Sequence, residues 1–221
     1  MRRAIFIFVM LLAAPNVARA AEIPQGAQTG RVVDRIVARV EGDIILESQV
    51  RQLGAFQQLI EGRAESDDQL LSELIEQWIV QTEAAASHFP EPSQSEVDRE
   101  LARLTARFAS PEANAAKLHE LGLSAAEARQ LLARQIYIER YLDYKFRPAV
   151  QIDSAAIDAY YQNELLPELA KKNQPAPRQA DVAEQIRELL VQRGISELAA
   201  KWLDETKSRL KIERTPPEAK P

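Results

Sequence analysis

The side chains that most often perform chemistry in proteins are few or scattered in this sequence. It has no cysteine and only two histidines, His88 and His119, which lie far apart with no acidic cluster beside either. A thiolate nucleophile and a cysteine-based metal site are therefore excluded, and a histidine metal site or catalytic triad would need partners that the sequence does not offer. We interpret both histidines as helix-surface or cap residues.

Carboxylates are plentiful, but their spacing is that of solvated helix faces. Glu73 with Glu76 and Asp98 with Glu100 are examples. An acid–base pair needs a cleft whose environment separates the two pKa values, and no pattern in the sequence indicates one. A glycine-rich phosphate-binding loop is also missing from the sequence. We predict no enzymatic activity, no cofactor and no metal ion.

The composition indicates a helix-rich globular protein. Of the 221 residues 46% are hydrophobic, which suffices for a core in one or two domains, and glycine occurs only seven times. Alanine, leucine, glutamate, glutamine and arginine, which favour helices, are abundant. We expect a mainly α fold rather than an all-β one.

The N-terminal residues have the layout of a secretory signal peptide. Arg2 and Arg3 precede an apolar run at residues 4–14, and Ala18–Ala20 supplies the small residues of a cleavage site. The run is well short of the roughly 20 residues that span a membrane, and the missing cysteine excludes lipid attachment. We predict that residues 1–20 are a signal peptide cleaved after Ala20, which leaves no stable membrane anchor.

The charge of the mature chain disfavours one class of partner. Removal of residues 1–20 takes away three arginines and no acidic residue, which leaves 25 basic and 33 acidic residues and changes the formal net charge from −5 to −8. A surface of that sign repels phosphate backbones, so we predict no nucleic-acid binding.

The two ends of the mature chain are predicted to meet in a small sheet. After a flexible leader at residues 21–32, two β-branched runs flank a turn at Glu41–Asp43 and predict a hairpin. A lone hairpin is marginal in water. The alternating segment at residues 210–214 is the expected partner, and residues 215–221 are expected to be a disordered tail.

Helices are predicted between these strands. The first expected helix is capped by Ser48 and ended by Glu61–Gly62, and the second runs from Asp67 to Phe89. Capping boxes at Ser93/Glu96 and Ser124/Glu127 begin two more, and between them lies one capped by Ser110 and ended by Leu121–Gly122. A further helix is capped by Asp153, and a long one runs from about residue 177 to 210. Gly194 falls within an apolar ridge of the last helix, where it indicates close approach of a neighbouring helix.

Residues 33–50, VDRIVARVEGDIILESQV, resemble the start of the mature SurA-like periplasmic chaperones. The order of later segments is similar too: Leu74–Ile75 and Ile79 in a long helix, the capping box at Ser93, the turn Leu121–Ser124, the helix with Arg134–Ile136, the segment Asp153–Tyr161 and the return from Ile186 to Ile212. The resemblance implies a periplasmic helical chaperone domain over residues 33–214, with one part at 33–147 and another at 150–214.

The sequence departs from that family in one respect. Full-length members insert a parvulin prolyl isomerase module of about one hundred residues, a domain-sized insertion, where this chain has only residues 162–181. The resemblance therefore implies an ATP-independent chaperone for unfolded or nascent envelope polypeptides, without isomerase activity.

Apolar residues at helix ends or beside helix breakers are the candidate peptide contacts, and ordinary core packing is the alternative for each. They are Phe56, Ile60, Phe89, Phe108 and Tyr144. Trp78 and Trp202 lie in regular apolar stripes and are assigned to the core. Methionine, which favours promiscuous surfaces, occurs only at Met1 and Met10. A structural or assembly protein that binds one dedicated partner or a second copy of itself is therefore the alternative function.

Overall fold

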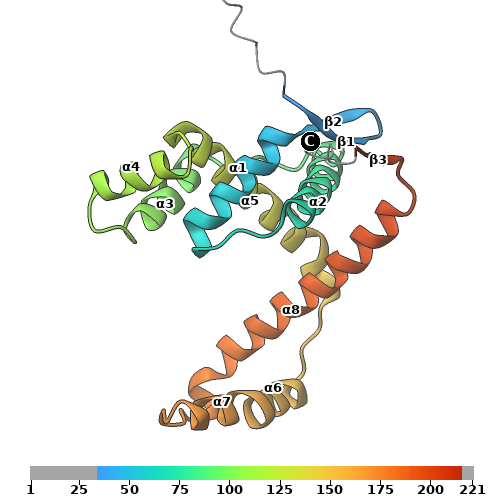
Figure 1. Ribbon diagram of the computed structural model, residues 1–221. Coiled ribbons are helices and arrows are strands. Elements are labelled where there is room, and N and C mark those ends of the chain that lie inside the picture. The colour runs from blue at the N-terminus through green and yellow to red at the C-terminus, as the bar shows by residue number, and fades with distance from the viewer. Residues whose placement is uncertain (1–33, 216–221) are drawn as a thin grey trace, which may run out of the picture. The chain divides into compact units, whose positions relative to one another are not determined.

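A computed structural model describes residues 34–215, and the predicted mainly α fold with a small antiparallel sheet is confirmed (Figure 1). The predicted signal peptide and leader, and the tail after Thr215, lie outside the described residues. The elements are β1 (Ile36–Val40), β2 (Asp43–Leu46), α1 (Glu47–Glu61), α2 (Asp67–Ala86), α3 (Gln94–Thr105), α4 (Pro111–Glu120), α5 (Ala125–Phe146), η1 (Arg147–Ala149), α6 (Ser154–Tyr160), η2 (Tyr161–Leu165), α7 (Leu166–Lys171), α8 (Gln179–Lys207) and β3 (Ile212–Arg214).

The sheet joins the two ends of the described chain, as predicted. Its strand order is β2-β1-β3, and β1 pairs antiparallel with both neighbours. The β1–β2 turn consists of Glu41 and Gly42, whose φ values of 52° and 101° suit the right-handed twist of a two-residue hairpin. Val40 is opposite Ile212 across β1 and β3. The amide of Thr215 donates to Val37 O at 2.9 Å, which extends the pairing one residue into the predicted tail.

The start of α1 differs from the prediction that Ser48 caps it. The helix begins at Glu47, and the side chain of Gln49 accepts a hydrogen bond from the Leu46 amide at 2.8 Å. Ser48 instead donates its hydroxyl hydrogen to Asp34, and its amide donates to the same carboxylate at 3.1 Å. The serine ties the segment before β1 to the first turn of α1, a long-range role that local sequence does not reveal.

The end of α2 also differs, because the helix stops at Ala86 rather than Phe89. His88 has a φ of 53°, its amide donates to Ala85 O at 3.0 Å, and the amide of Phe89 donates to Ala84 O at 2.9 Å. These bonds form a Schellman motif, in which a left-handed residue satisfies the last helix carbonyls. Glycine usually occupies that position, so the histidine gave no stop signal.

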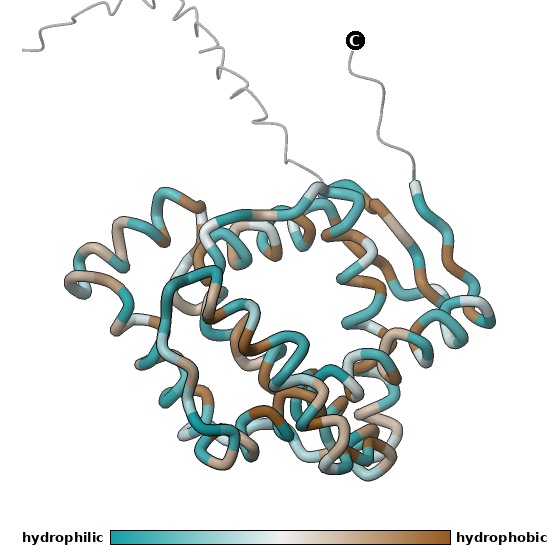
Figure 2. The backbone as a smooth tube through the Cα atoms, turned by 90° about the horizontal axis from the view of Figure 1, so that it is seen from below, coloured by the Kyte–Doolittle hydropathy of each residue, from teal (hydrophilic) through white to brown (hydrophobic). Residues whose placement is uncertain are grey.

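The other predicted helix boundaries are confirmed where they depend on local capping. Ser93 and Ser124 form capping boxes with Glu96 and Glu127. Gly122, with a φ of 68°, closes α4, and the Leu123 amide donates to Leu118 O at 3.0 Å. Amphipathic periodicity is visible along the helices in Figure 2, where hydrophobic and hydrophilic segments alternate.

The sheet, α1–α5 and the C-terminal part of α8 form what we call the body, residues 34–149 and 195–215. Its main apolar cluster joins β1 and β2 to α1, α2, α5 and α8. Trp78 and Trp202, assigned to the core from the sequence, are half-buried and pack against this cluster. A second cluster joins α1 to α3, α4 and α5.

Residues 152–193 form what we call the arm, in which α6, η2 and α7 pack along the N-terminal half of α8 (Figure 1). The run from α6 to α7 is continuous, with the amide of Leu166 donating to Tyr161 O across a π turn. Pro167 follows directly, and because it lacks an N–H it cannot continue the α-helical bonding at that point. The Tyr161 hydroxyl donates to Pro177 O at 2.6 Å, which secures the connection into α8.

Gly194 lies where α8 passes from the arm to the body. A Cβ atom there would lie 2.7 Å from Val150 Cγ1, closer than atoms pack. The predicted close approach is confirmed, but the neighbour is not a helix: Val150 lies in the connection after η1. Backbone approach at this point is possible only because glycine has no side chain.

Candidate functional site

The structure separates the five predicted contact residues into two groups. Phe56, Ile60 and Phe108 belong to the second apolar cluster, around the α1–α3 contact. Phe89 and Tyr144 lie together, with ring centroids 5.2 Å apart. The peptide-binding role of all five stays a prediction, so the surroundings of each group decide which one has the features of a site.

In the first group, exposure differs strongly between neighbours. Phe56 is only 3% exposed and packs as core. Phe108 is half-buried. Ile60, also half-buried, lines a cavity of about 270 Å³ between α1, α2 and α5. Phe56 and Ile60 both line the cavity, and Ile60 is the more exposed of the two.

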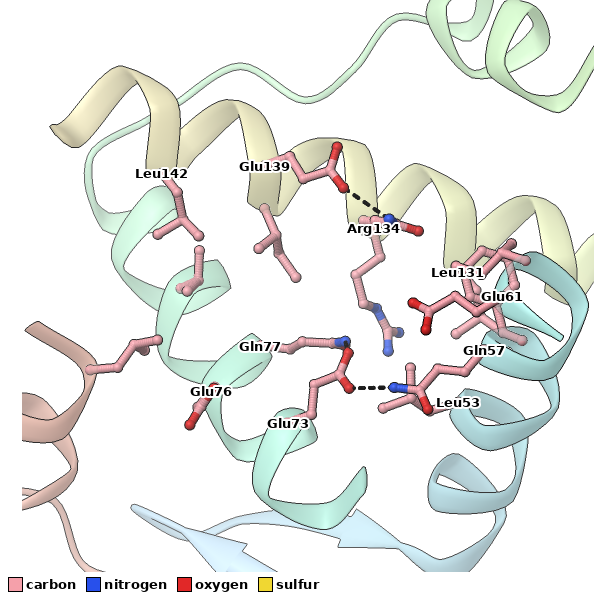
Figure 3. A pocket seen from close by; sticks show the side chains of 16 residues that line it. Leu53, Gln57, Glu61, Glu73, Glu76, Gln77, Leu131, Arg134, Glu139 and Leu142 are labelled. Atoms are coloured by element: carbon pink, nitrogen blue, oxygen red, sulfur yellow. Dashed lines mark hydrogen bonds between the residues drawn. The ribbon is translucent and has the colours of Figure 1, made fainter. Parts of the chain in front are cut away.

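The walls of this cavity, which we call the groove, are mostly apolar (Figure 3). They come from three helices and the end of a fourth: Leu53, Phe56, Ile60, Val80, Leu131, Ile138, Leu142 and Leu203. Glu61 and Glu139 also line it and are exposed, so the groove opens to the surface. A surface-open apolar groove can bind apolar side chains of another molecule.

One side of the groove carries a buried polar network. The Gln57 side chain, 8% exposed, donates to Glu73 at 2.7 Å, and its carbonyl oxygen accepts from the Glu65 amide at 3.1 Å. Gln77 donates to the other oxygen of Glu73 at 2.9 Å. Burial raises the pKa of the Glu73 carboxyl, although these hydrogen bonds oppose the shift.

Arg134 reaches from α5 into the same space without a partner. Figure 3 shows its side chain directed between α1 and α2, toward Gln57, Gln77 and Glu73. Within residues 34–215 it makes no hydrogen bond or ion pair, and burial lowers the pKa of its guanidinium. A half-buried guanidinium carries five N–H donors that normally find acceptors, so this donor group is available to a ligand.

Gln77 presents the matching acceptor. Its Oε1 atom is buried and has no hydrogen-bond partner among the described residues. Buried side-chain oxygens in proteins nearly always have a partner, and each exception needs a physical reason. The side chains that line the groove therefore include an unused donor group on Arg134 and an unused, covered acceptor on Gln77.

Acidic side chains surround the mouth of the groove. Glu76 pairs with Lys207 at 2.9 Å, and Glu139 accepts a hydrogen bond from Gln135 at 2.8 Å. Glu61 completes the acidic set and lines the groove beside Ile60. With Glu73, four glutamates and one arginine line the space, so its formal charge is negative.

The polar residues of the groove were not predicted to form a site, and Glu73, interpreted from the sequence as part of a solvated helix face, is half-buried. Gln57 follows the apolar stripe of Val50, Leu53 and Ile60 on α1, and Arg134 falls between Leu131 and Ile138 on α5. A polar residue at a core-facing position of an amphipathic helix is the signal that could have identified them. Their convergence depends on how three helices pack, which the spacing alone does not give.

The second group lies in an aromatic cluster of Phe89, Tyr137, Tyr141 and Tyr144. Tyr144 is 65% exposed, while Tyr141 is buried. The Arg140 guanidinium lies 5.6 Å from the centroid of the Phe89 ring, so the cluster is covered in part by charge. These rings pack against one another, whereas the groove combines apolar side chains from three helices with the unpaired groups of Arg134 and Gln77.

Other site types can be checked over the same part of the chain. Among residues 34–215, no helix combines the length and apolar character needed to cross a membrane. Nor do these residues include a cluster of three or more metal-ligand side chains arranged to hold an ion. The sequence matches no known protein-family model, and no curated protein is similar enough to count as a relative.

Proposed function

We propose that this protein is an exported, ATP-independent chaperone that holds unfolded polypeptides of the cell envelope, as the SurA-like resemblance implies. The observation that carries the proposal is the groove between α1, α2 and α5, which is apolar, open to the surface and furnished with unpaired polar groups. Its volume of about 270 Å³ lies just below the range of roughly 300–1,000 Å³ for small-molecule pockets. That space suits a few side chains of a passing segment.

The fold supports the proposal in a second way. The hairpin of β1 and β2 is completed by β3 from the far end of the chain, and α8 returns from the arm to the body. This closure places α1, α2 and α5 in one body around the groove. A chaperone that works without nucleotide needs a site of this kind, because its binding must come from the fold itself.

Aggregation of an unfolded outer-membrane-type protein, diluted from denaturant and followed by light scattering, tests the proposal. The chain of residues 21–221 at an equimolar ratio without nucleotide should suppress it, and Ile60→Asp should lose most of that protection. Leu189→Asp is the matched control, since Leu189 is 39% exposed on α8 outside the groove. Both variants are first shown to unfold cooperatively.

The outcomes separate the two functions considered for this fold. A holding chaperone that uses the groove is supported if the wild-type chain and Leu189→Asp protect the client from aggregation and Ile60→Asp does not. No protection by the folded wild-type chain would overturn the proposal, and would favour an assembly protein with one dedicated partner or with itself.

The absence of isomerase activity is part of the proposal. The interval of residues 162–181 consists of the π turn, α7, a short connection and the start of α8, which support a helical return rather than an inserted catalytic module. The chain should leave the rate of a proline-limited refolding reaction unchanged. Acceleration that persists through further purification would contradict this part.

Export is a proposal that can be tested separately. Expressed with residues 1–221, the protein should accumulate in the periplasmic fraction with a mature N-terminus at residue 21. N-terminal sequencing of the fractionated protein provides the measurement, and retention of residues 1–20 on a membrane-bound chain would contradict a cleavable signal.

A further inference from the structure

The geometry points to main-chain recognition in the groove: Arg134 donates to a peptide carbonyl of the bound segment and Gln77 Oε1 accepts from a peptide N–H, so the preferred occupant is an extended, uncharged apolar segment. This inference rests on the proposed function and names the chemistry by which that site selects its clients.

The donor side of the inference is Arg134. Its guanidinium lines the groove, and among residues 34–215 no carboxylate or carbonyl accepts from it. Two of the neighbouring acids are already engaged, since Glu73 accepts from Gln57 and Gln77, and Glu76 pairs with Lys207. An arginine that is half-buried without an acceptor loses hydration and regains nothing in the free protein. A ligand carbonyl or carboxylate would supply the missing acceptor.

The acceptor side is Gln77 Oε1. The assignment of its amide is fixed by the neighbouring Glu73 carboxylate, which needs the Nε2 donor at 2.9 Å. The Oε1 atom therefore faces away from Glu73, buried and without a donor within the described chain. A ligand that carries an N–H or O–H group can satisfy it. A carboxylate has no hydrogen to donate, so it could use Arg134 but would leave Gln77 unpaired.

The charge of the surroundings argues in the same direction. Glu61, Glu73, Glu76 and Glu139 line the groove with a single arginine. An anionic ligand would be repelled by them, and an acidic client segment would meet the same field. A peptide unit is neutral and carries one donor and one acceptor, which matches the two unpaired groups.

The apolar walls contribute affinity for a client segment without selecting its amino-acid sequence. Leu131, Ile138 and Leu142 of α5 line the groove together with Leu53 and Ile60 of α1. Apolar contact is non-directional, while hydrogen bonds to the main chain are the same for every residue type except proline. Together they explain how one groove could accept many sequences although the described chain has no flexible methionine-rich surface.

Binding of fluorescent peptides to the chain of residues 21–221, measured by anisotropy, tests the inference. The reference is an acetylated and amidated ten-residue peptide of alternating leucine and serine. Its relatives carry two glutamates in place of serines, a free terminal carboxylate, or an ester in place of one amide at each position in turn. The ester removes one N–H with little change of shape.

Arg134→Met and Gln77→Met remove the two polar groups and keep the side-chain length. Each should lower the affinity for the reference peptide by about tenfold or more, as expected for the loss of a hydrogen bond that involves a charged or buried group. Arg129→Met, on the same helix but paired with Asp98 outside the groove, is the matched control and should bind as wild type. Thermal unfolding establishes that all three fold.

The ester scan identifies the Gln77 contact directly. An ester at one position should weaken binding to the wild-type chain. The same ester should reduce the affinity of Gln77→Met much less, because that variant already lacks the oxygen that accepts from the replaced N–H. Equal loss in both proteins would overturn the assignment, as would tighter binding of the glutamate or free-carboxylate peptides.

Failure of the inference is distinguishable from failure of the proposed function. If wild type binds the reference peptide and Ile60→Asp does not, while Arg134→Met and Gln77→Met bind as wild type, the groove holds clients by apolar contact alone and the inference is wrong. If the folded wild-type chain neither binds any peptide nor suppresses aggregation, the proposed function itself is wrong.

Discussion

The body and the arm are both helical, yet different forces stabilise them. The two apolar clusters of the body contain fifteen and seven buried residues, whereas the cluster of the arm contains three, Ile157, Tyr161 and Ile186. Burial of apolar surface is the dominant stabilising term in folding. The arm therefore gains less stability from the burial of apolar surface, and its local unfolding should require less free energy than that of the body.

Ion pairs between exposed groups also stabilise the arm, one within it and one between it and the body. Arg193 of α8 donates to both oxygens of Glu164 at 3.0 and 2.8 Å, and Arg147 donates to both oxygens of Glu188 at 2.9 and 2.7 Å. Exposed ion pairs contribute little each and weaken with salt. The groove therefore lies in the region with the larger apolar core, and we expect local unfolding to begin in the region with the smaller one.

The largest effect is expected from matched deletions in the two cores. Ile75→Ala in the body, at a side chain 1% exposed, should lower the global free energy of unfolding by about 2–5 kcal/mol. Ile186→Ala in the arm should change the global value less and remove amide-exchange protection from residues 152–193. Urea denaturation and hydrogen exchange provide the two measurements.

The exposed Leu189→Ala is the control for that pair and should stay within about 0.5 kcal/mol of wild type. Equal losses of global stability at Ile75 and Ile186, with uniform exchange across the chain, would show that body and arm unfold as one unit. The comparison between the regions would then fail.

The junction between the regions gives the next largest effect. Gly194→Ala places a Cβ atom 2.7 Å from Val150 Cγ1 and 3.0 Å from its Cγ2. Because valine is stiff at χ1, the contact cannot be relieved by rotation, and we expect a loss of about 1–3 kcal/mol in the free energy of unfolding.

A second substitution tests the cause of that loss. In a Val150→Ala background the clash disappears, and Gly194→Ala should become neutral or stabilising, since alanine gains up to about 1 kcal/mol over glycine in a helix. The double-mutant cycle by denaturant unfolding measures the coupling. A loss that is the same in both backgrounds would mean that the glycine is needed for another reason.

A smaller effect is expected from the buried carboxyl of the body. Burial raises the pKa of Glu73 above its ordinary value of 4.5, so the folded state keeps the proton to higher pH than the unfolded chain. The stability this proton confers is complete below pH 4.5 and is lost as the pH rises through the folded-state pKa. Relative to that of Glu73→Gln, the free energy of unfolding of wild type should fall by on the order of 1 kcal/mol or less between pH 4 and 7.

Thermal unfolding of both proteins across that pH range checks the sign. A stability difference that stays constant with pH would contradict a raised pKa in the groove. A difference that grows in favour of wild type as the pH rises would mean that hydrogen bonds from Gln57 and Gln77 outweigh burial.

The sequence predicted those features of the fold that are encoded locally. Capping at Ser93 and Ser124, the stop at Gly122 and the β1–β2 hairpin depend on neighbouring residues, and the alternation at residues 210–214 identified the third strand. Features that depend on distant residues were missed or misassigned. Ser48 bonds to Asp34, and Gly194 meets Val150 of a connection rather than a helix.

The site was less predictable than the fold for the same reason. Ile60 was identified because it is apolar and close to a helix end, but Phe56, which shares those properties, is core. Neither Arg134, which was quoted only for the resemblance, nor Gln77 was predicted as a site residue, because a single polar residue on a helix is usually solvated. Only the packing of α2 against α5 brings an unpaired donor and an unpaired acceptor into one space.

The smallest effect is expected at Glu188, whose carboxyl contrasts with that of Glu73. Two hydrogen bonds from Arg147 lower its pKa to about 2, so the stabilising contribution is present above the ordinary value of 4.5 and is lost as the pH falls toward 2. Because the pair is exposed, Glu188→Gln should leave the melting temperature at pH 7 almost unchanged. Amide exchange in residues 152–193 should accelerate by only about two- to fivefold, and less at 1 M salt. An equal acceleration of exchange in the body would show that this ion pair stabilises the whole chain. Acceleration confined to the arm would mean that exposed charges affect the local opening of the arm independently of the body, which carries the groove.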